Sequence, residues 1–551
     1  MAMFGSENYF GLRGSKLNLA ITVVSGLDFA LFGYDQGVMG GLLTLPSFVA
    51  TFPEIDTLRD TSNYTSTIQG ISVSSYNLGC FLGAIVTIFI GDVLGRRRMI
   101  FLGSCIMIVG AVLQACAFSL GQLVAGRVIT GVGNGMNTST VPTWASETSE
   151  SHTRGRMVMF QGAMITGGIA LSYWLDFGLS FVEQDSVSWR FPIAFQILPA
   201  VLILMFILQL PESPRWLVLR KREAEAKGVL SALADLPEDN EGVRKTFGMI
   251  KDQVAEAANS GYRDLFTMGP ERNFHRVVLA YTIQVFQQIS GINLITYYAA
   301  TIFEKYIGLD GRTSRILAAG NGSVYFIASF IAPFTIEKLG RRKSMLWGSV
   351  GMVASMVILA VMNYLSENGI GGSTPGVVST VFLFAFNIFF AGGWLAVPWL
   401  YPAEIVPLKI RAPANGLSTS ANWIFNFMVV MITPVAFNSI GYKTYIIFAV
   451  INFFMMPVIY FLYPETAYRN LEEIDLIFLE TKSWFGAVGA AKKLELEFGK
   501  RGDLSVVPEK MVLESVVGGA IGMKEIGSSN GSVMHEENAS RPRYTSGESM
   551  A

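Results

Sequence analysis

Eight stretches of this sequence are each long enough to cross a lipid bilayer and contain no Asp, Glu, Lys or Arg. A membrane-spanning helix needs roughly 20 consecutive, mostly apolar residues. Only helices and closed barrels can span a membrane, because every backbone polar group must find its partner inside the structure. The eight stretches therefore predict transmembrane helices at residues 61–91, 99–126, 277–303, 316–336, 344–366, 376–403, 413–442 and 444–464.

Four further apolar segments carry one or two charged residues and complete the set of predicted spans. They are residues 17–41, 123–146, 157–178 and 190–210. The composition agrees with a membrane protein, since 15% of the residues are charged, against about 25% in soluble domains. We therefore expect an all-α membrane protein with twelve transmembrane helices. The first of them follows a polar start and has span length, which predicts an uncleaved signal anchor.

The composition also excludes several functional classes. A net charge of −1 provides no general attraction to nucleic acid. The three cysteines lie in apolar runs and the three histidines are far apart, which disfavours a disulfide framework and a metal site. No phosphate loop and no nucleophile constellation is found in the sequence. We therefore expect a protein that is not an enzyme and that needs no cofactor or metal.

The short loops differ in charge between the two sides of the predicted membrane protein. Three loops are basic, namely 95–99, 153–156 and 340–344, whereas the loop at 42–60 is acidic on balance. Basic loops face the cytosol, so an even number of spans places both termini there. Asn63-Tyr-Thr, on the outer side, is an N-glycosylation sequon that is either used or left unmodified.

These assignments divide the chain into five parts. A cytosolic N-terminus (1–16) precedes a six-helix half (17–211), a charged cytosolic linker (212–273), a second six-helix half (274–464) and a cytosolic tail (465–551). The linker has an alanine-rich pattern, REAEAKGVLSALADL, that predicts short amphipathic helices. The distal tail is rich in Ser, Gly and Asn, and we expect it to be disordered.

The two predicted halves repeat one another at three equivalent places. After the second span of each half, two residues separate an acid from Gly-Arg-Arg, and a Pro-Glu motif follows the last span. The third pair places Glu seven residues before Arg. An internal repeat of this kind predicts a transporter with its binding site near the midplane, between the halves. The paired segments are 91–98 and 337–344, 211–217 and 464–475, and 146–155 and 403–412.

With these motifs the chain resembles the major facilitator superfamily and, within it, the sugar porter family. The resemblance extends from about Leu17 to Asp475 and includes GRVITGVGNG (126–135), PESPRWL (211–217) and QQISGIN (287–293). It implies a secondary transporter that binds a small sugar or polyol, lies in the plasma membrane and works as a monomer.

The resemblance also implies a gate of ion pairs on the cytosolic side. These pairs would tie helix ends together in the outward-facing state and release on inward opening. The alternative is that the basic residues only mark the cytosolic side. The residues of the implied gate are Asp92, Arg96, Glu147, Arg154, Glu337, Arg341, Glu404 and Arg411.

Polar and aromatic side chains inside the second half predict a binding site for a hydroxyl-rich ligand. Gln287, Gln288 and Asn293 lie in the predicted span seven, and amides both donate and accept hydrogen bonds. Alternatively, such amides join helices to one another. By the resemblance, amides bind hydroxyls, a tryptophan stacks on the ligand, and two tyrosines close the outer side. The predicted group is Gln287, Gln288, Asn293, Tyr297, Tyr298, Trp394, Asn422, Trp423 and Asn426.

One position departs from the family pattern. Many sugar porters carry a sugar-binding glutamine in span five, some fourteen residues after an Arg-Gly pair, where this chain has Ile169. The missing hydrogen-bond partner leaves the identity of the sugar open. The segment SYWLDFG (172–178) also resembles glycerol symporters, so a polyol, or a disaccharide in another pose, is an alternative.

Asp35 is an acidic residue in an apolar, glycine-rich segment of span one, LFGYDQGVMGGLL. A charge at the bilayer centre costs about 2.5–3.5 kcal/mol on insertion scales, and a partner relieves this cost. At 1.5 Å per residue, Asp35 and Arg127 of span four both lie in the outer half of the membrane. By resemblance to proton-coupled sugar porters the two form a proton switch, and the alternative is a fixed salt bridge. Asp28 is either a second protonation site or a partner for neighbouring backbone, and we expect Asp176 to be interfacial.

The leading hypothesis is therefore uptake of a monosaccharide, a hexose or a pentose, with a proton by alternating access. Alternatives within the same fold are a glycerol, polyol or disaccharide symporter and a passive sugar facilitator. A sugar sensor is a further alternative, although the tail has no recognisable repeats of the kind expected for signalling.

Overall fold

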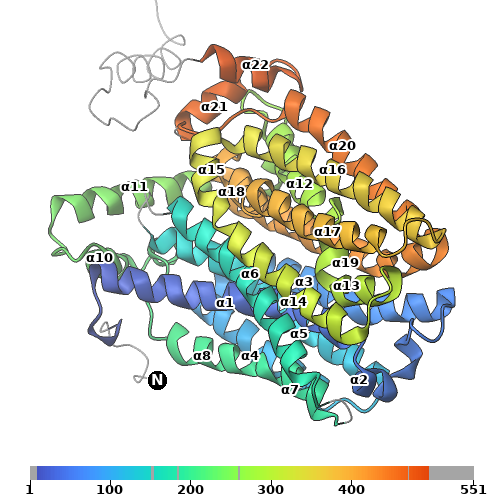
Figure 1. The fold of residues 1–551 in the computed structure, drawn as a ribbon. Helices are drawn as coiled ribbons and strands as arrows, with labels where there is room; N and C mark the ends of the chain where they lie inside the picture. Colours follow the sequence, from blue (N-terminus) through green and yellow to red (C-terminus); the bar gives the residue numbers. More distant parts are fainter. Residues whose placement is uncertain (1–8, 150–153, 183–184, 259–260, 470, 495–551) are drawn as a thin grey trace, which may run out of the picture. The chain divides into compact units, whose positions relative to one another are not determined.

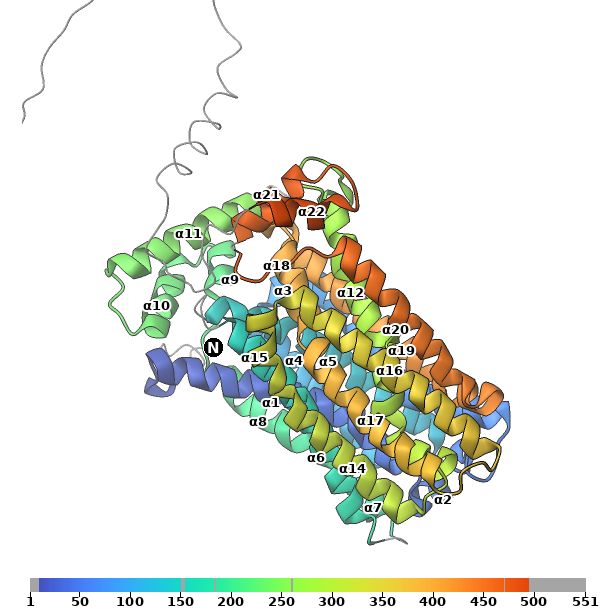
Figure 2. The same ribbon diagram turned by 45° about the horizontal axis from the view of Figure 1, so that its top comes forward.

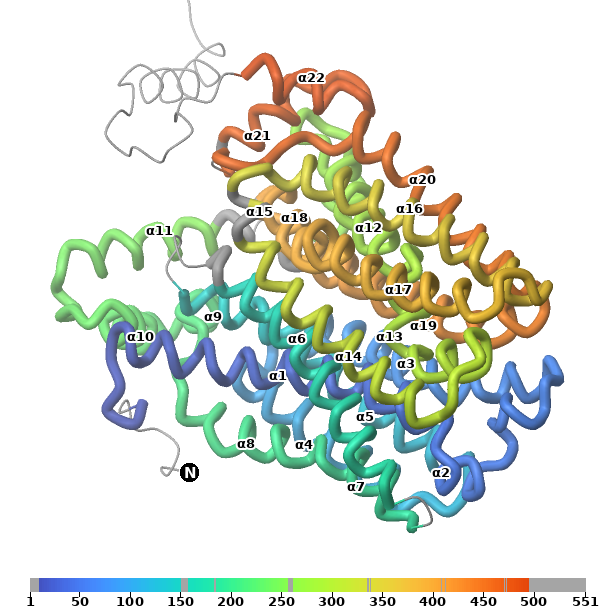
Figure 3. Tube along the Cα trace, viewed as in Figure 1, coloured from blue at the N-terminus to red at the C-terminus, as the bar shows by residue number. Residues whose placement is uncertain are grey.

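The computed structural model describes residues 9–149, 154–182, 185–258, 261–469 and 471–494. Every regular element in these residues is a helix. Ten helical stretches among them are long and apolar enough to cross a membrane. The expected all-α membrane fold is therefore confirmed, and Figures 1 and 3 show its long helices running alongside one another.

The first half of the fold contains six spans. α5 has 29 residues but is rich in Gly, Asn and Thr, and many of its residues are buried among the other helices. The short α2 (Pro46–Thr51) connects the first two spans. The spans are α1 (Gly14–Leu42), α3 (Asn63–Leu94), α4 (Arg96–Ala115), α5 (Leu120–Thr148), α6 (Arg154–Leu179), and α7 (Val187–Phe195) continued by α8 (Ile197–Ile207).

The second half repeats this arrangement with more interruptions. Three of its spans are each divided into two helices, whereas the other three are continuous. The spans are α12 (Asn273–Ile289) with α13 (Ile292–Thr301), α14 (Gly311–Ser329) with α15 (Ile331–Leu339), α16 (Arg341–Glu367), α17 (Thr374–Gly393) with α18 (Val397–Ile405), α19 (Arg411–Ile440) and α20 (Lys443–Leu462).

The break between α12 and α13 lies within the QQISGIN motif. Gly291 has a φ of 103° here, a conformation that residues with a side chain rarely adopt. A Cβ at this position would also lie 2.6 Å from Cε of Met356. Neither α12 nor α13 alone is long enough to cross the bilayer. Together with the more polar α5, this interrupted span completes the twelve predicted spans.

The two ends of the fold differ in what they carry. The linker helices α9 (Pro214–Leu219), α10 (Glu223–Ala234) and α11 (Glu241–Ala258) lie at one end (Figures 1 and 2). Trp216 of α9 donates a hydrogen bond to the carbonyl of Asp92 (2.8 Å), beside the first Gly-Arg-Arg loop. We call this the basic end, and the end that carries α2 the opposite end. Two further helices after the last span are α21 (Leu471–Glu480) and α22 (Gly486–Lys493).

α1 and α6 approach one another closely because glycines face the partner backbone. A Cβ on Gly33 would lie 1.9 Å from the carbonyl oxygen of Ile165, and one on Gly168 would lie 2.0 Å from the carbonyl oxygen of Ala30. Small residues at helix contacts of membrane proteins allow this close approach. The contact positions the part of α1 that carries Asp35.

At the opposite end, hydrogen bonds join the two halves directly. The guanidinium of Arg315 on α14 donates to the carbonyl of Thr44 beyond α1 (2.7 Å). The amide of Asn438 on α19 donates to the side-chain oxygen of Asn63 on α3 (2.9 Å). The halves are therefore closed on one another at this end.

Candidate functional site

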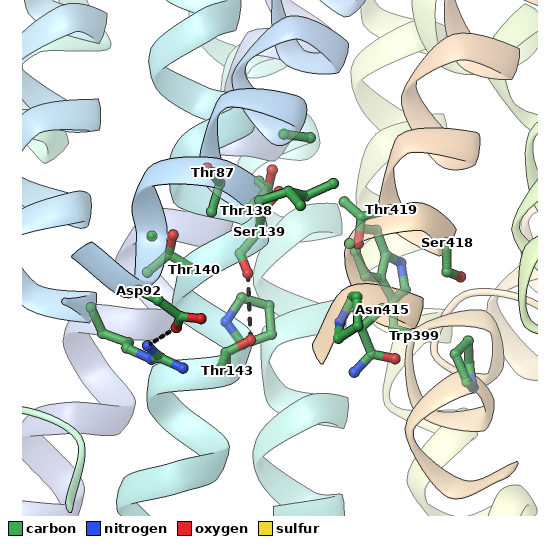
Figure 4. Close-up of a pocket in the computed structure, with 18 of the residues that line it drawn as sticks. Thr87, Asp92, Thr138, Ser139, Thr140, Thr143, Trp399, Asn415, Ser418 and Thr419 are labelled. Carbon is green, nitrogen blue, oxygen red and sulfur yellow. Dashed lines mark hydrogen bonds and ion pairs between the residues drawn. The ribbon is translucent and has the colours of Figure 1, made fainter. Parts of the chain in front are cut away.

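A cavity of about 170 Å³ lies between the two halves. Asp92 and Arg96 line its edge, so it lies toward the basic end. Hydroxyl groups of α3 and α5 form one wall, and α18 and α19 form the other with a tryptophan, an amide and further hydroxyls (Figure 4). Such groups suit a ligand that carries many hydroxyls. The wall residues labelled in Figure 4 are Thr87, Thr138, Ser139, Thr140, Thr143, Trp399, Asn415, Ser418 and Thr419.

Five amide side chains form a connected cluster around the break in span seven. Asn422 of α19 donates to the side-chain oxygens of Gln284 (2.7 Å) and Gln287 (3.0 Å). Asn293 donates to Gln288 (2.7 Å), which in turn donates to Gln287 (3.2 Å). Gln284 also lines the cavity, so the cluster reaches the cavity wall. The hydroxyl groups of a bound ligand can both donate and accept hydrogen bonds, so they can replace any of these contacts between amides.

The sequence-predicted substrate residues lie beyond the cavity. None of the nine, all of which the structure describes, is part of the cavity wall. Trp394 is fully buried, and its indole N–H is directed to α16, donating to the carbonyl of Met345 (3.1 Å) and to Oγ of Ser349 (3.0 Å). Its own carbonyl accepts from Gln287 (2.8 Å). The backbone of Trp394 therefore holds Gln287 of the amide cluster, while its indole ring is bound to α16.

Trp423 joins the two halves through aromatic contacts. Its ring lies edge-on to Phe32 of α1, with centroids 5.1 Å apart, and to Tyr76 of α3, with centroids 6.3 Å apart. Because Asn422 is the preceding residue, these contacts occur at the level of the amide cluster. In this conformation the three rings occupy space between the halves.

The remaining predicted substrate residues are buried between the amide cluster and the opposite end. The hydroxyl of Tyr297 donates to Asn77 of α3 (3.0 Å), and that of Tyr298 donates to the carbonyl of Val430 (2.8 Å). Asn426 is fully buried, and neither its oxygen nor its nitrogen has a hydrogen-bond partner among the described residues. An unsatisfied buried amide is costly, so Asn426 is a position where a bound hydroxyl or water would stabilise the fold.

Asp35 and Arg127 are both fully buried in the first half. Arg127 donates to the carbonyl of Val73 (3.2 Å) and lies 5.1 Å from the centroid of the Tyr76 ring. Neither carboxylate oxygen of Asp35 has a hydrogen-bond partner among the residues that the structure describes. A buried carboxylate without a fixed partner requires either a proton or an approaching cation. The pairing of Asp35 with Arg127 stays a prediction.

Two other acidic residues inside the first half are also buried. Asp28 accepts a hydrogen bond from the side chain of Asn137 on α5 (2.8 Å), and Asn137 also donates to Ser104 (3.1 Å). The observed partner of Asp28 is therefore an amide side chain, whereas neighbouring backbone is the partner considered from the sequence. Asp176, expected to be interfacial, is only 3% exposed because other helices bury it, and its depth in the membrane stays a prediction. A Cβ on Gly41 of α1 would lie 2.3 Å from Oδ2 of Asp176, so the last turn of α1 lies against this carboxylate.

Ile169 lies at the contact between α6 and α1. It is 3% exposed, and a Cβ on Gly37 of α1 would lie 3.1 Å from its carbonyl oxygen. The apolar side chain offers no hydrogen bond where many sugar porters have glutamine.

The predicted gate residues form ion pairs within each half at the basic end. Arg96 pairs with Asp92 (2.9 Å) and with Glu147 (3.1 Å) in the first half. Arg341 pairs with Glu404 (2.8 Å) in the second half. These pairs therefore hold neighbouring helices of one half together in the conformation described here.

Three other members of the predicted gate are less closely defined. Arg411 donates to the carbonyl of Val406 (3.2 Å) in its own half. The side chains of Arg154 and Glu337 lie outside the described residues. The role of the whole set in gating stays a prediction.

The two Pro-Glu motifs cap equivalent helices at the basic end. Glu212 accepts from the first two backbone N–H groups of α4 (3.1 and 3.2 Å), and Glu465 accepts from the first two of α16 (2.8 and 3.1 Å). Burial raises the pKa of the Glu212 carboxyl, although the backbone donors and nearby arginines oppose this shift. The internal repeat of the sequence is thus also a repeat of hydrogen bonds.

Apart from Asp92 and Arg96, the residues of the cavity wall were missed from the sequence, and so was Gln284 of the amide cluster. Gln284 lies three residues before Gln287, a spacing that places both on one helix face, and this signal was sufficient to find it. Trp399 had no signal beyond its aromatic ring. The hydroxyl-rich run NTSTVPTW (137–144), unusual inside a predicted span, also pointed to the cavity wall.

Comparison with known proteins identifies the family. The family model described as "Sugar (and other) transporter" matches residues 19–478. The chain belongs to this family of transporters. Sugar transporter STL1 of Saccharomyces cerevisiae is 42% identical over 479 residues, which cover 86% of this chain and 83% of that protein. Major facilitator superfamily transporter mfsA of Aspergillus fumigatus is 39% identical over 502 residues, which cover 88% of this chain and 91% of that protein.

A solved structure supports the arrangement of the transporter in two halves. The structure of the proton:xylose symporter XylE bound to 6-bromo-6-deoxy-D-glucose matches with a TM-score of 0.72 and 24% sequence identity, covering 84% of this chain and 100% of that one. At this identity the match shows the major facilitator fold alone. The family prediction is confirmed, and the protein is a membrane transporter and not an enzyme.

Proposed function

We propose that this transporter takes up a monosaccharide, a hexose or a pentose, together with a proton by alternating access. The observation that carries the proposal is the environment of Asp35, a fully buried carboxylate with no hydrogen-bond partner among the described residues. Ionisable residues inside membrane spans commonly serve proton relays. The names of two similar proteins, a sugar transporter and a proton:xylose symporter, support the substrate class and the coupling ion.

The amide cluster supports a sugar as the transported molecule. Its side chains come from α12, α13 and α19 of the second half, and Gln284 reaches the cavity between the halves, where a substrate must bind to be exposed to each side in turn. The cavity on the basic end and the closed opposite end support an inward-facing state, if the arginine-rich loops face the cytosol. In this orientation both termini are cytosolic. We place the transporter in the plasma membrane, as the resemblance to sugar porters implies.

A polyol is the second candidate substrate, and Ile169 is the observation that favours it. The isoleucine stands where many sugar porters have a sugar-binding glutamine, so span five offers one hydrogen-bonding side chain fewer. A site with fewer polar groups matches a smaller ligand with fewer hydroxyls, such as glycerol.

Uptake into cells that lack endogenous sugar transporters tests both parts of the proposal. Radiolabelled glucose should accumulate, and unlabelled glucose, xylose, sucrose and glycerol should be compared as competitors. An uncoupler and Asp35→Asn should each abolish accumulation against a gradient, whereas Asp239→Asn, on the exposed linker, should not. Accumulation that survives Asp35→Asn would contradict the coupling. Failure of every competitor would contradict the substrate class.

A further inference from the structure

Asp176 is a buried acidic residue to which the proposed proton step assigns no role. It lies near the end of α6, and neither of its carboxylate oxygens has a hydrogen-bond partner among the described residues. A Cβ on Gly41 would lie 2.3 Å from its Oδ2, so the carboxylate lies directly against the last turn of α1. An ionisable residue in such a place is expensive and is by default a candidate for function.

Arg315 approaches the same place from the other half of the transporter. Its guanidinium donates to the carbonyl of Thr44 (2.7 Å), two residues beyond the end of α1. The carbonyls at a helix C-terminus carry partial negative charge, which favours a cation there. Arg315 is 7% exposed, so its charge is buried at this end of the fold. The end of α1 thus lies between a carboxyl group from its own half and a cation from the other half.

Neighbouring contacts place this pair on the seam between the halves. The indole of Trp174 on α6 donates to Ser323 on α14 (2.7 Å), and the hydroxyl of Tyr173 donates to the carbonyl of Thr296 on α13 (2.7 Å). Figures 1 and 2 both show α6 and α14 side by side. Opening of the opposite end requires α14 to move away from α1 and α6.

We propose that Asp176 and Arg315 are positioning residues of the transport cycle that hold the outer end of α1 against α14 while the cavity faces the basic end. We call the pair the outer latch. The inference rests on the proposed function, because it assumes that the opposite end opens to admit substrate. In opening, Arg315 leaves the carbonyl of Thr44 and the vicinity of Asp176, and both charges reach water. The strength of the latch therefore sets the fraction of molecules closed at this end.

Spin-label distances across the seam test the latch on the purified full-length protein. Labels are attached at Asn63→Cys and Asn438→Cys, two positions that contact one another across the halves, after the three natural cysteines are replaced by serine. The parent should show mainly a short distance. Arg315→Gln should increase the ratio of long to short distances by about tenfold or more, since it removes a hydrogen bond from a charged group and leaves Asp176 buried without its cation.

Matched variants separate the latch from a general loss of charge or of folding. Arg263→Gln removes an exposed arginine of the linker segment before α12 and should leave the distances as in the parent. The double variant Asp176→Asn/Arg315→Gln leaves no lone charge and should recover part of the short distance. If Arg315→Gln does not fold, Arg315→Lys, which loses the planar fork, should show a smaller shift in the same direction.

Two outcomes would overturn the inference. The first is a distance distribution of Arg315→Gln, or of Arg315→Lys in its place, that equals the parent's. The second is an equal shift in Arg263→Gln. Because the distances are measured without sugar and without a proton gradient, failure of the latch is distinguishable from failure of the proposed transport reaction.

Discussion

Replacing Gly33 by alanine tests whether the close contact of α1 with α6 is needed to hold the helix that carries Asp35. Alanine is the best helix former, and in an ordinary helix it stabilises by about 1 kcal/mol relative to glycine. Here its Cβ would lie 1.9 Å from the carbonyl oxygen of Ile165. An ordinary contact between a Cβ and another atom begins at 3.4 Å. The backbones of α1 and α6 must therefore move apart by about 1.5 Å, which is 3.4 Å minus 1.9 Å.

The expected magnitude follows from this clash. Overpacking a close-packed interior typically costs about 1–3 kcal/mol, and the upper end applies because the obstructing atom belongs to backbone and cannot rotate away. After the gain in helix propensity, we expect a net loss of about 1–2 kcal/mol. A loss of this size changes the ratio of folded to unfolded protein by a factor of about 5–30.

Thermal inactivation of the purified transporter measures this loss. Gly178→Ala is the matched control, because Gly178 is an exposed residue of α6 around which a Cβ would meet nothing within 4 Å. It should be neutral or slightly stabilising, whereas Gly33→Ala should inactivate at a lower temperature and transport less. If Gly33→Ala is as stable as Gly178→Ala, the close contact of α1 and α6 is refuted.

Four further variants test three other parts of the structure. Gln287→Ala, which removes a central member of the amide cluster, should raise the KM of sugar uptake by tenfold or more, and an unchanged KM would make the cluster purely structural. Glu212→Ala and Glu465→Ala each leave two backbone N–H groups unpaired at a helix start and should each cost about 1–3 kcal/mol in denaturant unfolding; a cost in only one half would contradict their equivalence. Hydrogen bonds from Thr65 and Ser62 lower the pKa of the Asp60 carboxyl in the folded protein. They therefore stabilise the fold at a pH above the pKa that Asp60 has in the unfolded chain. This stability is lost as the pH falls through the pKa that Asp60 has in the folded protein. Asp60→Asn should remove this acid dependence of hydrogen exchange at the start of α3.

The transmembrane spans could be predicted from the sequence because the bilayer acts locally. Any stretch of roughly 20 apolar residues is sufficient to span, whatever lies elsewhere in the chain. The same holds for the two halves, since the paired motifs that begin and end their helices can be compared directly. The Glu caps at α4 and α16 are the structural counterpart of those motifs.

The interior of the site could be predicted only in part. The residue types of the amide cluster were recognised, but their hydrogen bonds were not. The cavity wall is formed by hydroxyls of α5 and by Trp399, whereas Trp394 was expected on the ligand and is directed toward α16. Which face of a helix meets the cavity depends on the rotation and tilt of that helix, and these are decided by packing against neighbours.

The sequence by itself determined the all-α fold, the number of spans, the repeat of the two halves and the resemblance to sugar porters, because each of these depends on residues close together in the chain. The tertiary structure alone decided which buried groups meet. Asn422 and Gln284 are 138 residues apart, and Arg315 and the carbonyl of Thr44 are 271 apart. The depth of Asp176 in the membrane can be estimated from the sequence, but its burial depends on the last turn of α1, which lies against its carboxylate. Contacts of this kind arise from the docking of whole helices.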